Sequence, residues 1–207
     1  DAPVSLLDLL PTFCELAGED AALPHDGHSL IAAAEDGAPD RYVFAQAHEA
    51  ADYDLVLVGY TSQSAEGVTV AGYAAAHTEK LSYLIAHRPG FVAPTLMARK
   101  FATFDQLWQG RLAIHIIAGL SDKEQMMDGD NLTKDDRYRR AGEYLAVMRK
   151  AWAGGEPFEF EGAFYSVRGA RTDILPLQQP HPTVYFGGSS EGALAMGAQH
   201  CDVFAMF

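Results

Sequence analysis

The stretch from Leu81 to Gly119 constrains the fold of this chain more than any other. It opens with the apolar run Leu81–Ala86, which is too short for a helix and is closed by an Arg-Pro-Gly break, so a buried strand is predicted. Apolar side chains then recur at helical spacing after Pro94, which suits a first helical turn, and Gly110 can supply a left-handed stop. The run Leu112–Ala118 predicts a second buried strand.

A strand, a helix and a strand in this order form a right-handed crossover between parallel strands. Parallel sheets need helices over their faces, so an α/β protein is predicted. Further strands are expected at 54–59, 183–186 and 202–206, and further helices at 65–76 and 191–200. Because no dinucleotide-binding glycine fingerprint follows any of these strands, part of a (β/α) barrel fits better than a Rossmann fold.

Between residues 119 and 182 this alternation is interrupted by a long excursion, which in compact domains usually carries function. It contains a polar run at 121–136, a helix with an apolar stripe from Tyr138 to Trp152, and a hairpin-like stretch with Gly162 at its turn. The acidic run Asp128–Asn131 does not fit an EF-hand, because its glycine is misplaced and the closing glutamate is missing. No calcium loop is therefore predicted.

The charge of the chain is strongly acidic and unevenly placed. The net charge is −13, and the first 50 residues hold ten acidic side chains against the single basic Arg41. A nucleic-acid partner is not expected, since neutralising phosphates requires clustered Lys and Arg. Cys14 and Cys201 are too few for a disulfide framework, so both are expected to be small buried side chains. No apolar run approaches the roughly 20 residues of a membrane span, and no basic leader is present, so a cytoplasmic protein without a membrane partner is expected.

Residues 1–50 differ in character from the rest of the chain. VSLLDLLPTFCELAG reads as a short helix and is followed by the polar turn LPHDGHSL. This segment resembles the later part of sulfatases of the alkaline-phosphatase type. The nucleophile of those enzymes needs a C/S-x-P-x-R context, which Cys14 lacks. His25, Asp26 and His28 are conceivable metal ligands, but such a turn is more often solvated surface, so no metal site is predicted. The expected organisation is an acidic appendage at 1–50 and a barrel portion at 51–207, with the join somewhere in 38–53.

In βα barrels ligands bind at the carboxyl ends of the strands, so the residues directly after each strand are candidates. They are Tyr60–Ser64, His87, Arg88, Ala118, Gly119 and Gly187–Ser190. The run YFGGSSEGAL passes from a strand into a helix through two glycines and two serines, so backbone N–H groups and hydroxyls could bind an anion at the positive end of the helix. The alternative is a tight turn whose serine caps the helix.

Charged side chains near the same ends support an anionic ligand. Arg88 follows a buried strand, where an arginine is not expected to be core, and could make a bidentate contact to a phosphate or carboxylate. His87 is either a second ligand contact or a satisfied edge histidine. His115 is expected in the core or the barrel interior, with ligand contact as the alternative.

From about residue 52 to residue 207 the chain resembles the bacterial luciferase-like, FMN-dependent monooxygenases, and within them the alkanesulfonate monooxygenase group. The elements that carry the resemblance are HRPGFVAPTLMARKFATFDQLWQGRLAIHIIAG, the D-x-R-Y motif Asp135–Tyr138, and QQPHPTVYFGGSSEGA. The resemblance implies an incomplete (β/α)8 barrel with about five to six parallel strands and an insertion after the fourth family strand. It further implies reduced FMN, supplied by an NAD(P)H-dependent flavin reductase, and O2 as the oxidant of a small organic substrate such as a sulfonate.

The same resemblance implies a set of cofactor-binding residues. They are His87, Arg88, Gly119, Tyr138, Gly188, Ser189 and Ser190. The arginine and the Gly-Ser-Ser turn are implied at the flavin phosphate, the tyrosine as a further flavin contact from the insertion, and His87 and Gly119 near the ring. A flat apolar ring needs an apolar barrel mouth, and its phosphate needs helix-end donors, so the residue types agree with this. No catalytic residue is assigned.

The chain departs from the family in three ways. Ser64 stands where sulfonate enzymes of this group carry a cysteine, and Lys134 stands where the insertion usually has a histidine. The last family strands have no counterpart before Phe207. Two hypotheses remain: a fragment of a flavin monooxygenase, or an inactive fusion or truncated product that acts at most as a binding or interaction module. An open sheet edge could pair with another chain, so a homo-oligomer is an expected option. A sulfatase fragment is the weaker third.

Overall fold

The computed structural model describes residues 54–119 and 121–205. The predictions for residues 1–50, including the sulfatase-like helix, Cys14, the turn with His25, Asp26 and His28, and the join, lie outside these residues. The chain divides into two compact units, residues 1–85 and residues 86–207, and each is described by itself.

The described part of the first unit is one strand, one helix and the start of a second strand. Strand β1 (Leu55–Val58) pairs in parallel with β2 (Ser82–His87), with Leu55 opposite Ser82 and Val58 opposite Ile85. Helix α3 (Gly67–Ala76) begins where the Glu66 carboxylate accepts hydrogen bonds from the backbone N–H groups of the first turn. The predicted strand at 54–59 and helix at 65–76 are confirmed, with slightly shorter bounds.

The second unit continues the alternation of strands and helices. Its strands are β3 (Leu112–Ile116), β6 (Thr183–Gly187) and β7 (Val203–Ala205), its helices are α4 (Pro94–Leu107), α5 (Asp122–Met127), α6 (Lys134–Ala153) and α7 (Glu191–His200), and its hairpin is β4 (Phe158–Glu161) with β5 (Ser166–Ala170). β3 pairs in parallel with β6, and β6 with β7. The parallel strands form one five-stranded sheet in the order β1-β2-β3-β6-β7, so the predicted α/β class is confirmed.

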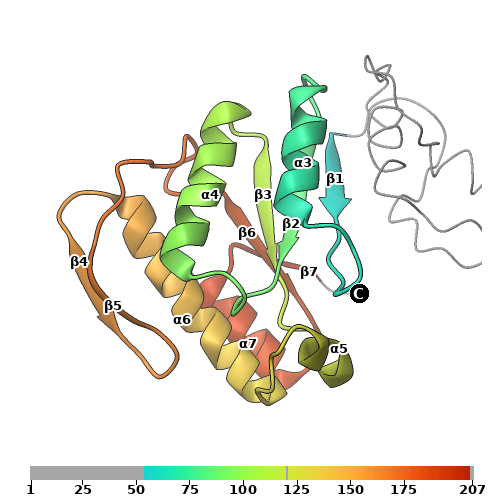
Figure 1. Ribbon diagram of the computed structural model, residues 1–207, viewed down its shortest axis with the longest axis vertical. Coiled ribbons are helices and arrows are strands. Elements are labelled where there is room, and N and C mark those ends of the chain that lie inside the picture. Colours follow the sequence, from blue (N-terminus) through green and yellow to red (C-terminus); the bar gives the residue numbers. More distant parts are fainter. Residues whose placement is uncertain (1–53, 120, 206–207) are drawn as a thin grey trace, which may run out of the picture. The chain divides into compact units, whose positions relative to one another are not determined.

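Side-chain alternation along the strands explains where the core lies. In β3 the side chains of Leu112, Ile114 and Ile116 are buried, whereas His115 is partly exposed on the opposite face. The long helices α4, α6 and α7 lie next to one another along the buried face (Figure 1). The Trp152 indole N–H donates to the Ala98 carbonyl at 2.9 Å, which fixes α6 against α4. The core is therefore a sheet-to-helix layer, as expected for parallel strands.

Two turns agree with the sequence analysis. Gly110 has a φ of +80° just after α4, so the predicted left-handed stop is confirmed. Gly162 lies in the hairpin turn, where its N–H donates to the Tyr165 carbonyl at 2.9 Å.

Cys201 is partly buried, and burial raises the pKa of its thiol to about 12, in keeping with a small apolar role.

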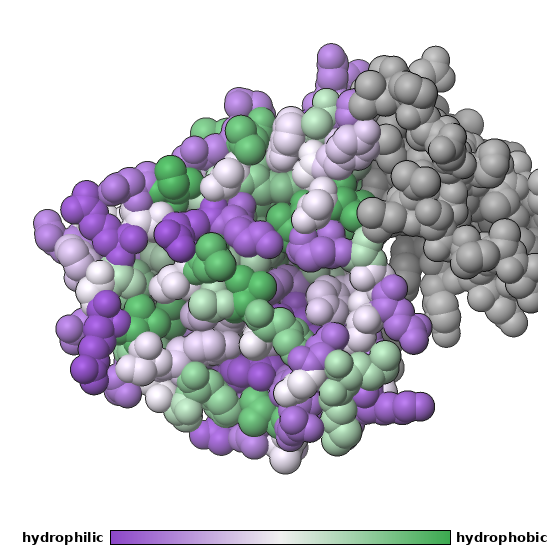
Figure 2. Space-filling model, viewed as in Figure 1, coloured by the Kyte–Doolittle hydropathy of each residue, from purple (hydrophilic) through white to green (hydrophobic). Residues whose placement is uncertain are grey.

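Polar and apolar residues alternate over the face of the molecule shown in Figure 2. Among the helices described here, none combines the length and the apolar composition needed to cross a membrane.

Candidate functional site

The turn after β6 leads directly into α7 and is shaped by one glycine. Gly188 has a φ of +151°, and a Cβ added there would lie 2.8 Å from the Ala193 Cβ, so the bare backbone approaches the first turn of α7. The Ser190 hydroxyl accepts a hydrogen bond from the Ala193 N–H at 3.3 Å and caps the helix. The helix-capping alternative is thus confirmed, and anion binding at the same turn stays a prediction.

Tyr138 and Ser190, far apart in the sequence, meet at this turn. The two hydroxyl oxygens lie 3.1 Å apart. Tyr138 stands in the first turns of α6, and its ring lies edge-on to Phe186 of β6 with the centroids 6.1 Å apart. A Cβ added at Gly192 would lie 2.9 Å from the Tyr138 ring, so this glycine lets the ring contact the start of α7. The structure therefore brings together two of the predicted cofactor residues.

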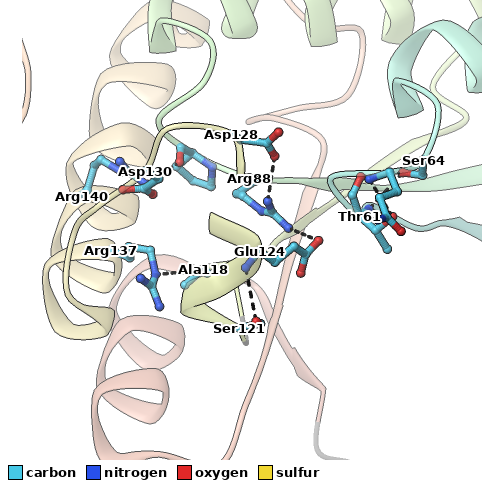
Figure 3. Close-up of polar contacts among 12 residues, drawn as sticks. Thr61, Ser64, Arg88, Ala118, Ser121, Glu124, Asp128, Asp130, Arg137 and Arg140 are labelled. Atoms are coloured by element: carbon cyan, nitrogen blue, oxygen red, sulfur yellow. Dashed lines mark hydrogen bonds and ion pairs between the residues drawn. The ribbon is translucent and has the colours of Figure 1, made fainter. Parts of the chain in front are cut away.

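The neighbouring Arg137 joins the same end of α6 to the end of β3. Its buried guanidinium donates from Nε to the Ala118 carbonyl at 2.9 Å (Figure 3). Its Nη2 donates to the Asp122 carboxylate at 2.6 Å. β3 and β6 are neighbours in register, with Ile116 opposite Phe186, so their carboxyl ends lie side by side. Arg137 and Tyr138 together hold α6 at both strand ends.

Arg88 has carboxylate partners in this structure. Its Nη2 lies 2.9 Å from Glu124 and its Nη1 lies 3.2 Å from Asp128, both on or next to α5 (Figure 3). The expectation that it is not a core residue is wrong, since its side chain is only 2% exposed. The pairing explains how a charge is tolerated there. Direct contact with a phosphate stays a prediction.

His87 is turned toward the helices. Its Nε2 lies 2.8 Å from the Tyr144 hydroxyl of α6, and its ring meets Phe101 of α4 edge-on, with the centroids 5.5 Å apart. This is the arrangement of a hydrogen-bonded histidine, which the sequence analysis held as the alternative. A position near a flavin ring stays a prediction.

Gly119 follows β3 with a φ of +80° and lies against Gln125. A Cβ added at Gly119 would overlap the Gln125 carboxamide, so only glycine fits this close approach. Gln125 is fully buried in α5. The close approach of the Gln125 carboxamide therefore explains why residue 119 is a glycine.

Two further candidates are the turn at 60–64 and His115 of β3. Thr61 and Ser64, in the first unit, close a turn on themselves, with the Ser64 hydroxyl donating to the Thr61 carbonyl at 2.9 Å. Burial lowers the pKa of His115, which keeps the ring neutral at neutral pH. The described residues hold no cluster of His, Cys, Asp or Glu suited to a metal ion.

Sequence reasoning missed three residues of this region. Gly192 and Arg137 lie inside the two motifs that carried the resemblance, but nothing in their spacing shows which partners they meet. Gln125 gave no signal, because a glutamine in a polar run predicts solvent exposure.

Together these features define a parallel α/β protein in which a glycine- and serine-containing turn follows β6, the in-register neighbour of β3. The model of the family described as luciferase-like monooxygenase matches residues 23–207, and the chain belongs to this family. The match begins within the segment that the sequence analysis assigned to a sulfatase-like appendage.

Solved structures show the same fold at low identity. EDTA monooxygenase from Chelativorans sp. BNC1 is 18% identical with a TM-score of 0.65, over 74% of this chain and 44% of that one. The oxygenating constituent of 3,6-diketocamphane monooxygenase from the CAM plasmid of Pseudomonas putida, in complex with FMN, is 19% identical with a TM-score of 0.59, over 74% and 47%. An F420-dependent secondary alcohol dehydrogenase is 24% identical with a TM-score of 0.61, over 73% and 48%. This chain thus spans less than half the length of each.

Proposed function

We propose that this chain is the flavin-binding part of a monooxygenase that uses reduced FMN and O2 to oxidise a small organic substrate. The observation that carries the proposal is the contact of Tyr138 with Ser190 at the start of α7. One hydroxyl of this pair donates to the other, so one O–H is left that can donate to a phosphate beside the start of the helix. Bound flavin supplies the electrons for the reaction with O2, and a separate NAD(P)H-dependent flavin reductase supplies the reduced flavin.

The groups at the turn have the chemistry to bind a phosphate. Gly188 lets the backbone approach the first turn of α7, and the Ser190 hydroxyl lies between the Ala193 N–H and the Tyr138 hydroxyl. The Lys134 ammonium lies 5.9 Å from the centre of the Tyr138 ring, which places a positive charge close to the proposed phosphate. Glu191 opposes an anion, but it is exposed to solvent and its field is screened there.

The proposed roles follow from these positions. Tyr138, Gly188, Ser189 and Ser190 bind the phosphate, and Gly119 lies at the neighbouring strand end, where the ring would reach. Arg88 holds α5 through its ion pairs, and His87 holds α6 through its hydrogen bond to Tyr144. Both would support the site in this way in addition to any direct contact with the flavin. An alkanesulfonate is the substrate that the sequence resemblance favours, and the cysteine-to-serine departure at Ser64 makes other small organic substrates equal candidates.

The phosphate assignment is tested by comparing FMN with riboflavin, which lacks the phosphate. Purified protein should bind FMN about tenfold to a hundredfold more tightly than riboflavin, because charge-assisted hydrogen bonds are the strong ones. Ser190→Asp should remove this preference through charge repulsion, while α7 keeps a good cap and riboflavin binding does not change. Tyr138→Phe should reduce the preference partly.

A matched control adds the same charge elsewhere. The Thr172 hydroxyl accepts from the Ile174 N–H at 3.1 Å in an exposed loop, and an aspartate can make the same bond. Thr172→Asp should therefore leave the FMN preference unchanged. No saturable binding of either flavin by the unaltered protein would favour the alternative, a non-catalytic binding module.

A further inference from the structure

Helix α5 (Asp122–Met127) buries a polar side chain and exposes its two methionines, which is the reverse of the usual pattern. The only side chain it buries is Gln125, which is 0% exposed, whereas Met126 and Met127 are 59% and 55% exposed. A short helix that is stabilised by packing would bury its thioethers and expose its carboxamide. The inversion therefore needs a reason other than the stability of the fold.

The buried carboxamide has no hydrogen-bond partner among residues 54–119 and 121–205. Within the described part of the chain, neither Nε2 nor Oε1 of Gln125 makes a hydrogen bond. Leaving a buried donor and a buried acceptor unpaired is destabilising, and native proteins rarely do so without a functional reason.

The flanking residues fix the direction in which this side chain points. Glu124 and Asp128, on either side of it in the sequence, both form ion pairs with the buried Arg88. The Ser121 hydroxyl accepts from the Glu124 N–H at 3.3 Å and fixes the start of the helix. α5 therefore cannot rotate Gln125 toward water without breaking these contacts. Ion pairs to the buried Arg88 thus keep a polar side chain in a buried position.

The carboxamide lies at the end of β3, against Gly119. β3 is the in-register neighbour of β6, whose end carries the turn with Ser190. A flavin whose phosphate is held at the start of α7 would extend its ring across the neighbouring strand end. Glycine takes either sign of φ, so the turn at Gly119 can move aside without the strain that a side chain would add.

On the basis of the proposed function, we infer that Gln125 binds the pyrimidine edge of the flavin ring. That edge presents the N3–H donor next to a carbonyl acceptor, and a carboxamide presents the complementary acceptor and donor. Both unpaired atoms of Gln125 would be satisfied at once. The glutamine is then a specificity residue for the ring, separate from the residues that bind the phosphate.

The test uses ring probes without a phosphate. Lumiflavin keeps the pyrimidine edge, and 3-methyllumiflavin lacks the N3–H group. The unaltered protein should bind lumiflavin about tenfold more tightly than the methylated probe, as two neutral hydrogen bonds allow. Gln125→Met, which keeps an unbranched side chain of similar size, should bind both probes equally and weakly. Met126→Leu, on the exposed face of the same helix, is the control and should keep the preference.

A second readout separates this role from a structural one. Without ligand, Gln125→Met should melt at the same temperature as the unaltered protein or higher, because it removes an unpaired buried amide. A lower melting temperature would overturn the inference, and so would an unaltered protein that does not discriminate the probes or a Gln125→Met variant that still does. If FMN is preferred over riboflavin in a Ser190-dependent manner while the probes are bound alike, the inference fails and the proposed function stands. If no flavin binds, both fail.

Discussion

The Nε2 atom of His87 lies 2.8 Å from the hydroxyl oxygen of Tyr144, so the last residue of β2 is joined to the middle of α6 inside the core. Burial raises the pKa of Tyr144 well above its usual range, so its hydroxyl stays protonated wherever the protein is folded. The bond fixes α6, and with it Arg137 and Tyr138, relative to the strand ends.

Tyr144→Phe should lower the free energy of unfolding by about 1–3 kcal/mol, because it removes one partner of a buried hydrogen bond. Urea denaturation monitored by fluorescence measures this loss. Tyr165→Phe is the matched control, since the buried Tyr165 hydroxyl has no hydrogen-bond partner in the described residues. Equal losses in the two variants would show that the bond to His87 contributes nothing.

The ion pairs of Arg88 predict that α5 depends on charge rather than on apolar packing. Arg88→Gln should destabilise α5 by about 2–3 kcal/mol, since its partners are partly exposed and the full cost of a broken buried pair is reduced. Hydrogen exchange at 122–127, which measures the opening of α5, should increase.

The double variant Glu124→Gln with Asp128→Asn separates the two possible roles of Arg88. If the arginine acts only through α5, the double variant should loosen the helix in the same way as Arg88→Gln. A tighter binding of FMN, but not of riboflavin, would show instead that the released guanidinium reaches the phosphate.

Much of the fold follows from local patterns in the sequence. The strands, α4 and α7 were predictable because apolar runs and helical spacing report burial directly, and Gly110 marks a helix end through its own backbone preference. Helix α5 was not predictable in this way. Its position depends on Arg88, which is distant in the sequence. Its buried side chain is polar, so the sequence of α5 shows no helical repeat of apolar residues.

The contacts among the candidate residues could not be predicted from the sequence. Tyr138 and the turn at Ser190 lay in separate motifs, and only the packing of α6 beside α7 shows that they touch. Arg88 and His87 were expected at the ligand because both follow a strand. Their neighbours Glu124 and Tyr144 could not be identified from spacing, since each pair is formed by tertiary contact.

The hairpin should depend on one carboxylate of α6. Glu143 accepts hydrogen bonds from the backbone N–H groups of Ala163 and Phe164, each at 2.8 Å, and of Tyr165 at 3.2 Å. Glu143→Ala should leave these donors to solvent and lower the stability of the hairpin by about 2–3 kcal/mol. Faster hydrogen exchange at 158–170 with little change in the core strands is expected. An unchanged hairpin would contradict this anchoring role.

Stability should fall as the solution becomes mildly acidic. Burial first, and the nearby Arg149 second, lower the pKa of His200 below its ordinary 6.5, and burial alone lowers the pKa of His115. The unfolded chain therefore binds protons more readily than the folded one between 6.5 and the lowered values. The stability contributed by the neutral rings is fully present above that window and is lost as the pH falls through it.

The packing of His200 shows why its protonated form is disfavoured. Its Nε2 lies where a Cβ of Gly142 would be only 2.8 Å away, so the ring is pressed against the backbone of α6. The Arg149 side chain donates to the His200 carbonyl at 2.8 Å and keeps a positive charge near the ring. Urea midpoints measured from about pH 8 to about pH 5.5 should decline in the unaltered protein. His200→Gln should flatten that decline, and His115→Gln combined with it should flatten it further. If the urea midpoints of the three proteins decline equally with pH, groups other than His200 and His115 cause the acid sensitivity.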